Sequence, residues 1–142
     1  MKLTIPQEIL DRIHSHGEAA YPEEGAGLMM GQVEEDGIRY VESILPLNNA
    51  REDNARHNRY LLTPEDMLQG EEVAEKRDQS IVGIFHSHPD HPARPSEFDR
   101  EWAIPWYSYL ITSVMDGQAA ESRSWRLDDD RSGFIEEALK NQ

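Results

Sequence analysis

The sequence contains no cysteine among its 142 residues, which excludes disulfide bonds and thiolate metal ligands. It also has no apolar run close to the roughly 20 residues that a membrane-spanning helix needs. The first residues turn acidic at Glu8 and lack the apolar centre of a signal peptide. We therefore expect a cytoplasmic protein that does not enter a membrane.

Basic residues are scarce as well, with 14 Lys and Arg against 28 Asp and Glu and a formal net charge of −14 at pH 7. Binding to a phosphate backbone depends on clustered basic side chains, so this balance disfavours nucleic acid as a partner. The acidic residues are spread along the chain rather than gathered in a tail. They fit a solvated surface, a surface that attracts a basic partner, or a salt-adapted host, and the sequence does not separate these causes.

What is present is a set of short periodic segments typical of one globular domain, which we expect residues 1–142 to form. The polar segment 48–58 is expected to be a loop. The remaining patterns predict, in chain order, a helix over 7–20, strands over 27–33 and 38–45, a helix from Thr63 to about Arg77, a strand over 80–88, a helix near Ser96, strands over 109–114 and 119–127, and a short helix over 134–140. This order predicts a mixed α/β fold of the α+β type, in which a single mixed β-sheet is sandwiched by helices.

The chemistry of the chain is concentrated in one segment, His86-Ser87-His88, with Asp99 eleven residues further on. Residues 81–85 are apolar and rich in β-branched and aromatic side chains, which is typical of a buried strand. Side chains two apart on a strand project to the same face, so the two histidines can converge on one ion if the strand continues through them. Two histidines and an aspartate suit Zn²⁺, and three protein ligands leave a fourth position for water. We therefore predict one catalytic zinc per chain and a hydrolase.

Other interpretations of the same residues stay open at this point. Ser96 and Asp99 have the spacing of a capping box, so both could simply begin a helix, although capping and metal binding are compatible. Of the adjacent acids Glu23 and Glu24, either could serve a metal site by position alone. Prolines at 89, 92 and 95 could form a polyproline ligand, but between two ligand candidates they more plausibly stiffen the loop that aims Asp99 at the histidines.

The motif resembles the signature of the JAMM (MPN-plus) metalloproteases: His-x-His-Pro, six residues, then Ser-x-x-Asp. The family's upstream glutamate before a Gly-Leu pair matches Glu24, in the stretch Glu24-Gly25-Ala26-Gly27-Leu28. Small prokaryotic members often carry a cysteine where Ala26 stands, a departure outside the metal site. The contexts 106–111 and 124–127 also look like small bacterial members, so the resemblance covers nearly the whole chain.

The resemblance implies the JAMM/MPN (cytidine-deaminase-like) fold and a zinc metalloprotease. In that case His86, His88 and Asp99 would be the metal ligands, Glu24 the general base, and Ser96 a donor to the developing oxyanion. Eukaryotic members of the family cleave isopeptide bonds after the Gly-Gly tail of ubiquitin, and small bacterial members are associated with ubiquitin-like β-grasp sulfur-carrier proteins. The implied activity is thus a deubiquitinase-like isopeptidase or peptidase acting on such a carrier or its conjugates.

Two alternatives belong to other classes of protein. One is a catalytically silent MPN scaffold, which requires a broken motif, whereas all five positions are intact here. The other is a RadC-like DNA-associated protein, which the net charge of −14 disfavours. A zinc deaminase is excluded because its Pro-Cys-x-x-Cys element needs cysteine. The exact substrate, the physiological metal and the oligomeric state stay undetermined, and a homodimer is left open.

Overall fold

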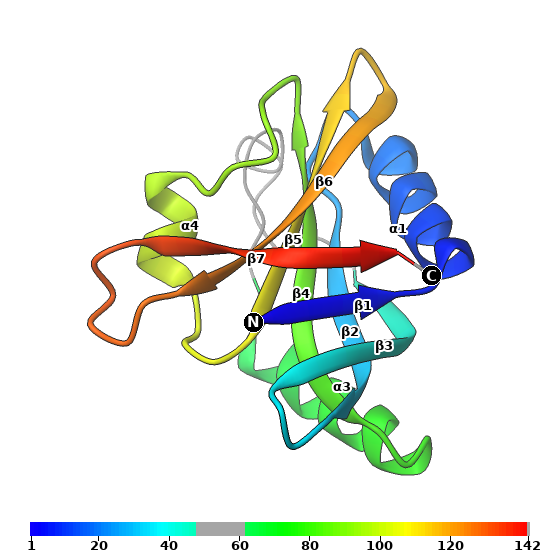
Figure 1. Cartoon of the computed structure of the whole chain (residues 1–142). Helices are drawn as coiled ribbons and strands as arrows, with labels where there is room; N and C mark the ends of the chain where they lie inside the picture. Colours follow the sequence, from blue (N-terminus) through cyan, green and yellow to red (C-terminus); the bar gives the residue numbers. More distant parts are fainter. Residues whose placement is uncertain (48–61, 142) are drawn as a thin grey trace.

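A mixed β-sheet that closes into a barrel dominates the computed structural model, which describes residues 1–47 and 62–141 (Figure 1). The predicted loop at 48–58 lies outside these residues. The strands are β1 Lys2–Ile5, β2 Ala26–Val33, β3 Ile38–Leu47, β4 Ser80–Pro89, β5 Ser108–Met115, β6 Gln118–Leu127 and β7 Phe134–Asn141. The helices are α1 Gln7–Ala20, α3 Pro64–Lys76 and α4 Glu97–Trp102. Around the barrel the strands follow the order β1-β3-β2-β4-β5-β6-β7, and β7 pairs with β1.

The predictions for the first two long helices are confirmed. Apolar side chains at three-to-four spacing bury one face of α1, including Ile9 and Ile13. At the start of α3, Thr63 Oγ1 accepts a hydrogen bond from the Asp66 N–H at 3.1 Å, and Asp66 Oδ2 accepts one from the Thr63 N–H at 3.0 Å. This reciprocal pair is the capping box that the sequence pattern predicts, followed by Pro64 at the first helical position.

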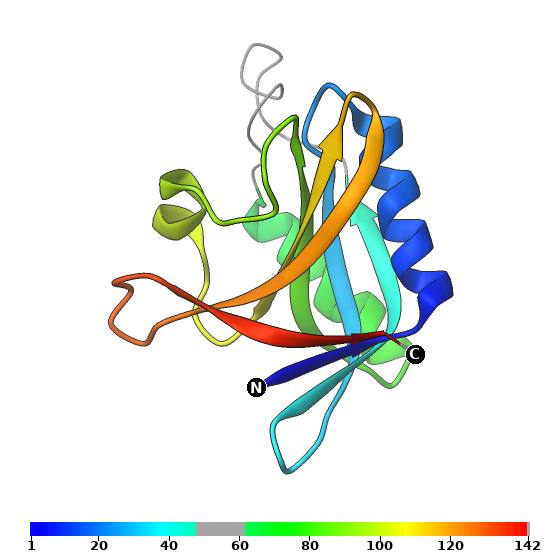
Figure 2. The same cartoon turned by 45° about the horizontal axis from the view of Figure 1, so that its top comes forward.

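The two helices lie on opposite faces of the central strands β2 and β4, as Figures 1 and 2 show together. One apolar cluster joins α1 to alternate strand residues such as Met29 and Phe85. The other joins α3 to the residues between them, such as Leu28 and Ile84. The predicted mixed sheet with helices on both faces is therefore confirmed, and β4 is buried from residue 81 to 88.

The predicted terminal helix over 134–140 is wrong, because this segment is strand β7. Its local composition, Glu136-Glu137-Ala138-Leu139-Lys140, favours a helix. Tertiary pairing overrides that preference: β7 runs antiparallel to β6 and parallel to β1. The sequence does not show the apolar–polar alternation typical of a strand, because the most buried position of β7 is a charged residue, Glu137. Its carboxylate accepts a hydrogen bond from Ser124 Oγ at 2.6 Å and lies 2.9 Å from Arg126 Nη2.

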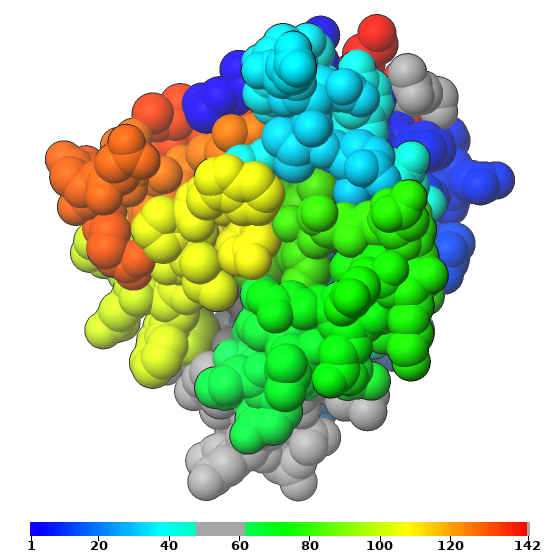
Figure 3. Space-filling model, turned by 90° about the horizontal axis from the view of Figure 1, so that it is seen from below, coloured from blue at the N-terminus to red at the C-terminus, as the bar shows by residue number. Residues whose placement is uncertain are grey.

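Strand β1 was not predicted either, since four residues before Pro6 are too short to show a period. Its Leu3 and Ile5 are fully buried, and its pairing with both β3 and β7 closes the sheet. The end of the molecule seen from below is covered by the β2–β3 turn, α3 and the segment that enters β5 (Figure 3). Within the described residues, every helix is too short or too polar to cross a membrane.

Candidate active site

Strand β4 continues through Pro89, so His86 and His88 project to the same face, as predicted. Both are buried, with 1% and 8% of their surface exposed, and their ring centroids lie 5.0 Å apart. The strand is held between β2 and β5, which pair with it up to His86 and Pro89 respectively. The histidines are therefore fixed near the carboxyl end of a central strand.

Helix α4 brings Asp99 to the histidines. Ser96 and Asp99 form a capping box: Ser96 Oγ accepts from the Asp99 N–H at 3.1 Å, and Asp99 Oδ2 accepts from the Ser96 N–H at 2.8 Å. The same Oδ2 lies 3.0 Å from His88 Nε2, while Oδ1 lies 3.7 Å from His86 Nε2. The Asp99 carboxylate thus stabilises the start of α4 and also faces both imidazoles. Its Oδ2 contacts both the Ser96 N–H and His88 Nε2.

Glu24 reaches the same place from the residues just before β2. Ser87 anchors its neighbour Gly25 twice, through a 2.9 Å bond from its N–H to the Gly25 carbonyl and a 2.8 Å bond from the Gly25 N–H to its hydroxyl. This places Glu24 Oε1 3.6 Å from His86 Nδ1, with only 3% of Glu24 exposed. Glu23, the other acid considered, is only partly buried and lines neither this cluster nor the cleft.

The donor atoms of this cluster could hold a divalent cation. A tetrahedral ion with ligand bonds of about 2.0–2.1 Å keeps neighbouring donor atoms roughly 3.3 Å apart. The contacts from Asp99 to the two Nε2 atoms, 3.7 and 3.0 Å, bracket this value. Donor atoms of Glu24, His86 and His88 also lie within 4.8 Å of one another, so the geometry offers a second ligand set in which Glu24 takes the place of Asp99.

The hydrogen bonds of His88 point to the same conclusion. Its Nδ1 lies 3.0 Å from the Pro92 carbonyl oxygen, which can only accept, so Nδ1 must carry a proton. A neutral ring would then turn the lone pair of Nε2 toward the Asp99 carboxylate at 3.0 Å. Only a cation between the two, either a proton or a metal ion, makes that contact favourable. Orientation of a ligand histidine through its other nitrogen is usual in metal sites.

Without a metal, the contact between His88 and Asp99 shifts the pKa values of both side chains. Burial by itself lowers the pKa of His88, but the hydrogen bond and charge of Asp99 outweigh it and raise the pKa above its usual value of 6.5. For Asp99 burial acts to raise the pKa, yet the charge of His86 and the contacts with His88 bring it far below the usual 3.8. These contacts favour the ionised form of the Asp99 carboxylate.

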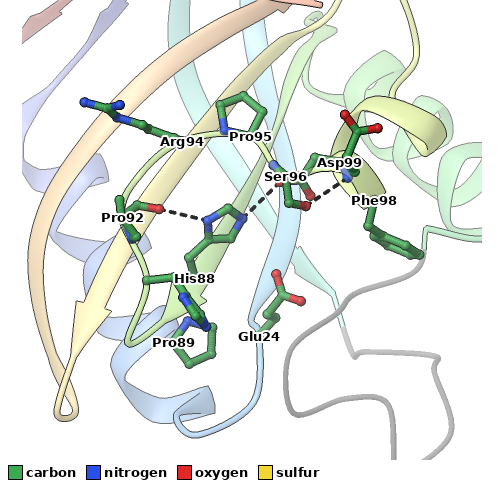
Figure 4. A pocket seen from close by; sticks show the side chains of 11 residues that line it. Glu24, His88, Pro89, Pro92, Arg94, Pro95, Ser96, Phe98 and Asp99 are labelled. Atoms are coloured by element: carbon green, nitrogen blue, oxygen red, sulfur yellow. Dashed lines mark hydrogen bonds and ion pairs between the residues drawn. The ribbon is translucent and has the colours of Figure 1, made fainter.

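These groups open into a cleft of about 460 Å³, which Figure 4 shows from close by. Its walls carry Glu24 and His88 on one side and Ser96, Phe98 and Asp99 on the other. Ser96 uses only a lone pair in the cap, so its O–H remains able to donate into the cleft.

Sequence reasoning missed two contacts that organise the loops of this site. Tyr21 O–H donates to Asp90 Oδ2 at 2.6 Å, which ties the segment before Glu24 to the loop after β4. Asp90 Oδ1 also accepts from the Asp116 N–H at 2.8 Å, at the turn between β5 and β6. No spacing rule joins residues 69 positions apart, so the sequence offers no signal for this bond.

Comparison with known proteins places the chain in a family. A family model described as prokaryotic homologs of the JAB domain matches residues 6–128, which include every residue of the cluster. The chain belongs to this family, and the resemblance to JAMM/MPN proteins is confirmed. It is 32% identical to the probable TtuB-protein conjugate cleaving protease of Thermus thermophilus over 79% of this chain and 72% of that protein. It is also 32% identical to a desampylase of Haloferax volcanii over 92% of both chains.

A solved structure shares the fold of this chain. The solution structure of protein DSY2949 from Desulfitobacterium hafniense superposes with a TM-score of 0.85 and 30% sequence identity. The match covers 99% of this chain and 92% of that one. Together with the named relatives, these findings support a hydrolase with a site that could bind metal.

Proposed function

We propose that this protein is a zinc-dependent peptidase that hydrolyses the amide bond after the Gly-Gly tail of a ubiquitin-like carrier protein. The observation that carries the proposal is the meeting of both histidine Nε2 atoms with Asp99, at 3.7 and 3.0 Å, beside a further buried carboxylate, Glu24. Two imidazoles and one carboxylate are the ligand types that a catalytic zinc uses.

In this proposal His86, His88 and Asp99 hold the ion, with one zinc per chain. When bound, zinc supplies a Lewis acid that brings the pKa of water to about 7. Glu24 takes the proton of the attacking water and delivers it to the leaving amine, a role for a carboxylate that is not itself a ligand. The Ser96 hydroxyl donates to the carbonyl oxygen as negative charge develops there. Residues 1–142 act as one domain, an assignment supported by the pairing of β1 with β7.

The names of the relatives support the proposed substrate class. One is named for cleaving conjugates of the protein TtuB, and others are named CysO-cysteine peptidases. We extend that class to this chain: a folded carrier whose flexible tail ends in two glycines. The tail lies extended across the site, and most of the binding energy comes from the folded body, because glycine has no side chain to hold.

The test is incubation of the zinc-loaded protein with Gly-Gly carriers extended by one residue or joined to a lysine, followed by intact mass. We expect release of the carrier ending in Gly-Gly, and no release by the Glu24→Gln variant. A short unstructured peptide with the same dipeptide should be turned over far more slowly. Equal turnover of that peptide would make the protein a general peptidase. Failure to cleave any carrier with full zinc content would favour the silent scaffold.

A further inference from the structure

The segment that carries Glu24 is anchored at both of its ends to the chain around His88. Two hydrogen bonds, of 2.8 and 2.9 Å, join its end nearer β2 to Ser87. At its other end the Tyr21 O–H donates to Asp90 Oδ2 at 2.6 Å. Ser87 and Asp90 lie on either side of His88 in the sequence. The position of Glu24 relative to the histidines is therefore set from both ends of its own segment.

Asp90 is a fixed partner for the Tyr21 hydroxyl. Its own N–H donates to the Val114 carbonyl at 2.7 Å, and its Oδ1 accepts from the Asp116 N–H at 2.8 Å. These bonds hold it to the end of β5 and the turn that follows, at the same end of the molecule as the segment before β2 (Figures 1 and 2). Asp90 has a φ of 57°, a left-handed conformation that aspartate tolerates. Because its backbone and one carboxylate oxygen are already held, the bond to Tyr21 costs little further side-chain entropy at Asp90.

The chain between Tyr21 and Glu24 is short and constrained. Only Pro22 and Glu23 lie between them, and the proline ring fixes its own φ. The Glu23 N–H donates to the Ala20 carbonyl at 2.8 Å, which closes the turn at the end of α1. A displacement of Tyr21 is therefore passed on to Glu24 and is not absorbed between them.

We propose that Tyr21 and Asp90 are positioning residues, whose hydrogen bond holds Glu24 where it accepts the proton of the attacking water. This inference rests on the function proposed above, in which Glu24 is the general base. A base acts only within hydrogen-bond reach of the proton that it removes, about 2.6–3.2 Å. A shift of its backbone lowers the rate without removing a metal ligand. Loss of the bond should therefore change kcat, and not the zinc content or KM.

The first experiment measures kcat, KM and zinc content of Tyr21→Phe, which loses only the hydroxyl. We expect kcat to fall by about tenfold, between the few-fold cost of one hydrogen bond and the roughly hundredfold cost of a misplacement of about 1 Å. The matched control is Glu18→Ala, because Glu18 Oε2 accepts from the Ala119 N–H at 2.9 Å and so joins α1 to β6. This variant should keep the wild-type kcat.

Three results of this experiment would overturn the inference. One is an unchanged kcat in Tyr21→Phe. Another is a loss of zinc in that variant, because the bond would then support the metal site itself. The third is an equal fall of kcat in Glu18→Ala, since any contact of α1 would then have the same effect.

A double-mutant cycle separates the hydrogen bond from the charge of Asp90. Removing Asp90 also removes a negative charge next in sequence to the cleft residues Pro89 and His91. Tyr21→Phe should lower kcat in the wild type but have little further effect in Asp90→Ala, because the two residues act through one bond. Asp90→Asn keeps one acceptor oxygen and can donate from its amide to the Tyr21 oxygen, so it should retain more activity than Asp90→Ala. Additive losses in the double variant would contradict the inference.

Hydrogen exchange measured by NMR tests the positioning without catalysis. In the zinc-loaded protein without substrate, the amide protons of Gly25 and Ser87 report on the other anchor of the segment. Tyr21→Phe should make both exchange several times faster, because the segment opens more often, and Glu18→Ala should not. This result supports the positioning of Glu24 even if the wild type cleaves no carrier and the proposed function fails. Exchange as slow as in the wild type would overturn it.

Discussion

Ser96 is proposed to do two things, and one substitution with a matched control separates them. It accepts a hydrogen bond from the Asp99 N–H at 3.1 Å as a helix cap, and its O–H is free to donate to a developing oxyanion. Thr63 makes the same capping bond to the Asp66 N–H, also at 3.1 Å, at the start of α3 and outside the cleft. Ser96→Ala loses both roles, and Thr63→Ala loses only a cap.

The two roles differ in size and in the quantity they change. Loss of a cap costs about 1 kcal/mol of unfolding free energy, with a range of roughly 0.5–2. Loss of one oxyanion donor costs about 10²–10³ in kcat, or roughly 3–4 kcal/mol of activation free energy. A protein with about 5–15 kcal/mol of stability stays folded after losing 1 kcal/mol, so the loss of global stability does not by itself lower kcat a hundredfold.

Urea unfolding of the zinc-loaded variants gives the first quantity, and initial rates on a carrier adduct give the second. We expect Ser96→Ala and Thr63→Ala to lose similar stability, but only Ser96→Ala to lose activity. Ser96→Thr keeps the hydroxyl and should retain most of both. If Ser96→Ala keeps kcat within a few fold of the wild type at full zinc content, Ser96 is only a cap. If Thr63→Ala is equally inactive, the loss reflects stability and the oxyanion argument fails.

Three further predictions test the ion, the charges and the packing of the site. Asp99→Ala should abolish stoichiometric zinc in elemental analysis, whereas Glu24→Gln should keep it; the reverse result would assign the ion to the ligand set that contains Glu24. In the metal-free protein, the raised pKa of His88 adds stability that is complete below pH 6.5 and is lost as the pH rises. The lowered pKa of Asp99 adds stability that is complete above pH 3.8 and is lost as the pH falls. Their joint contribution to the unfolding free energy should therefore peak between these values, and a pH series of urea unfolding should show this peak reduced in Asp99→Asn. Gly83→Ala should destabilise the fold by roughly 1–3 kcal/mol or more, because its Cβ would lie 2.3 Å from the Ser108 carbonyl oxygen, and an unchanged melting temperature would contradict this packing.

Local interactions explain why much of the fold could be predicted from the sequence. The first helix follows from its apolar spacing, and α3 follows from the capping residues Thr63 and Asp66, whose partners lie three positions away. The strand that carries His86 and His88 is short, apolar and β-branched, and its period of two places both rings on one face. Part of the metal-site prediction is also local, because Ser96 and Asp99 lie in one turn at the start of α4.

Tertiary structure decided the features whose cause lies far away in the chain. Strand β7 has the local composition of a helix and becomes a strand because β6 and β1 offer it hydrogen-bond partners on both sides. The buried carboxylate of Glu137 is stable there only because Ser124 and Arg126 satisfy it. Glu24 meets His86 only because Gly25 is bonded to Ser87, 62 residues away. The sequence by itself identified the candidate site residues, and pairing between distant strands decided how they meet.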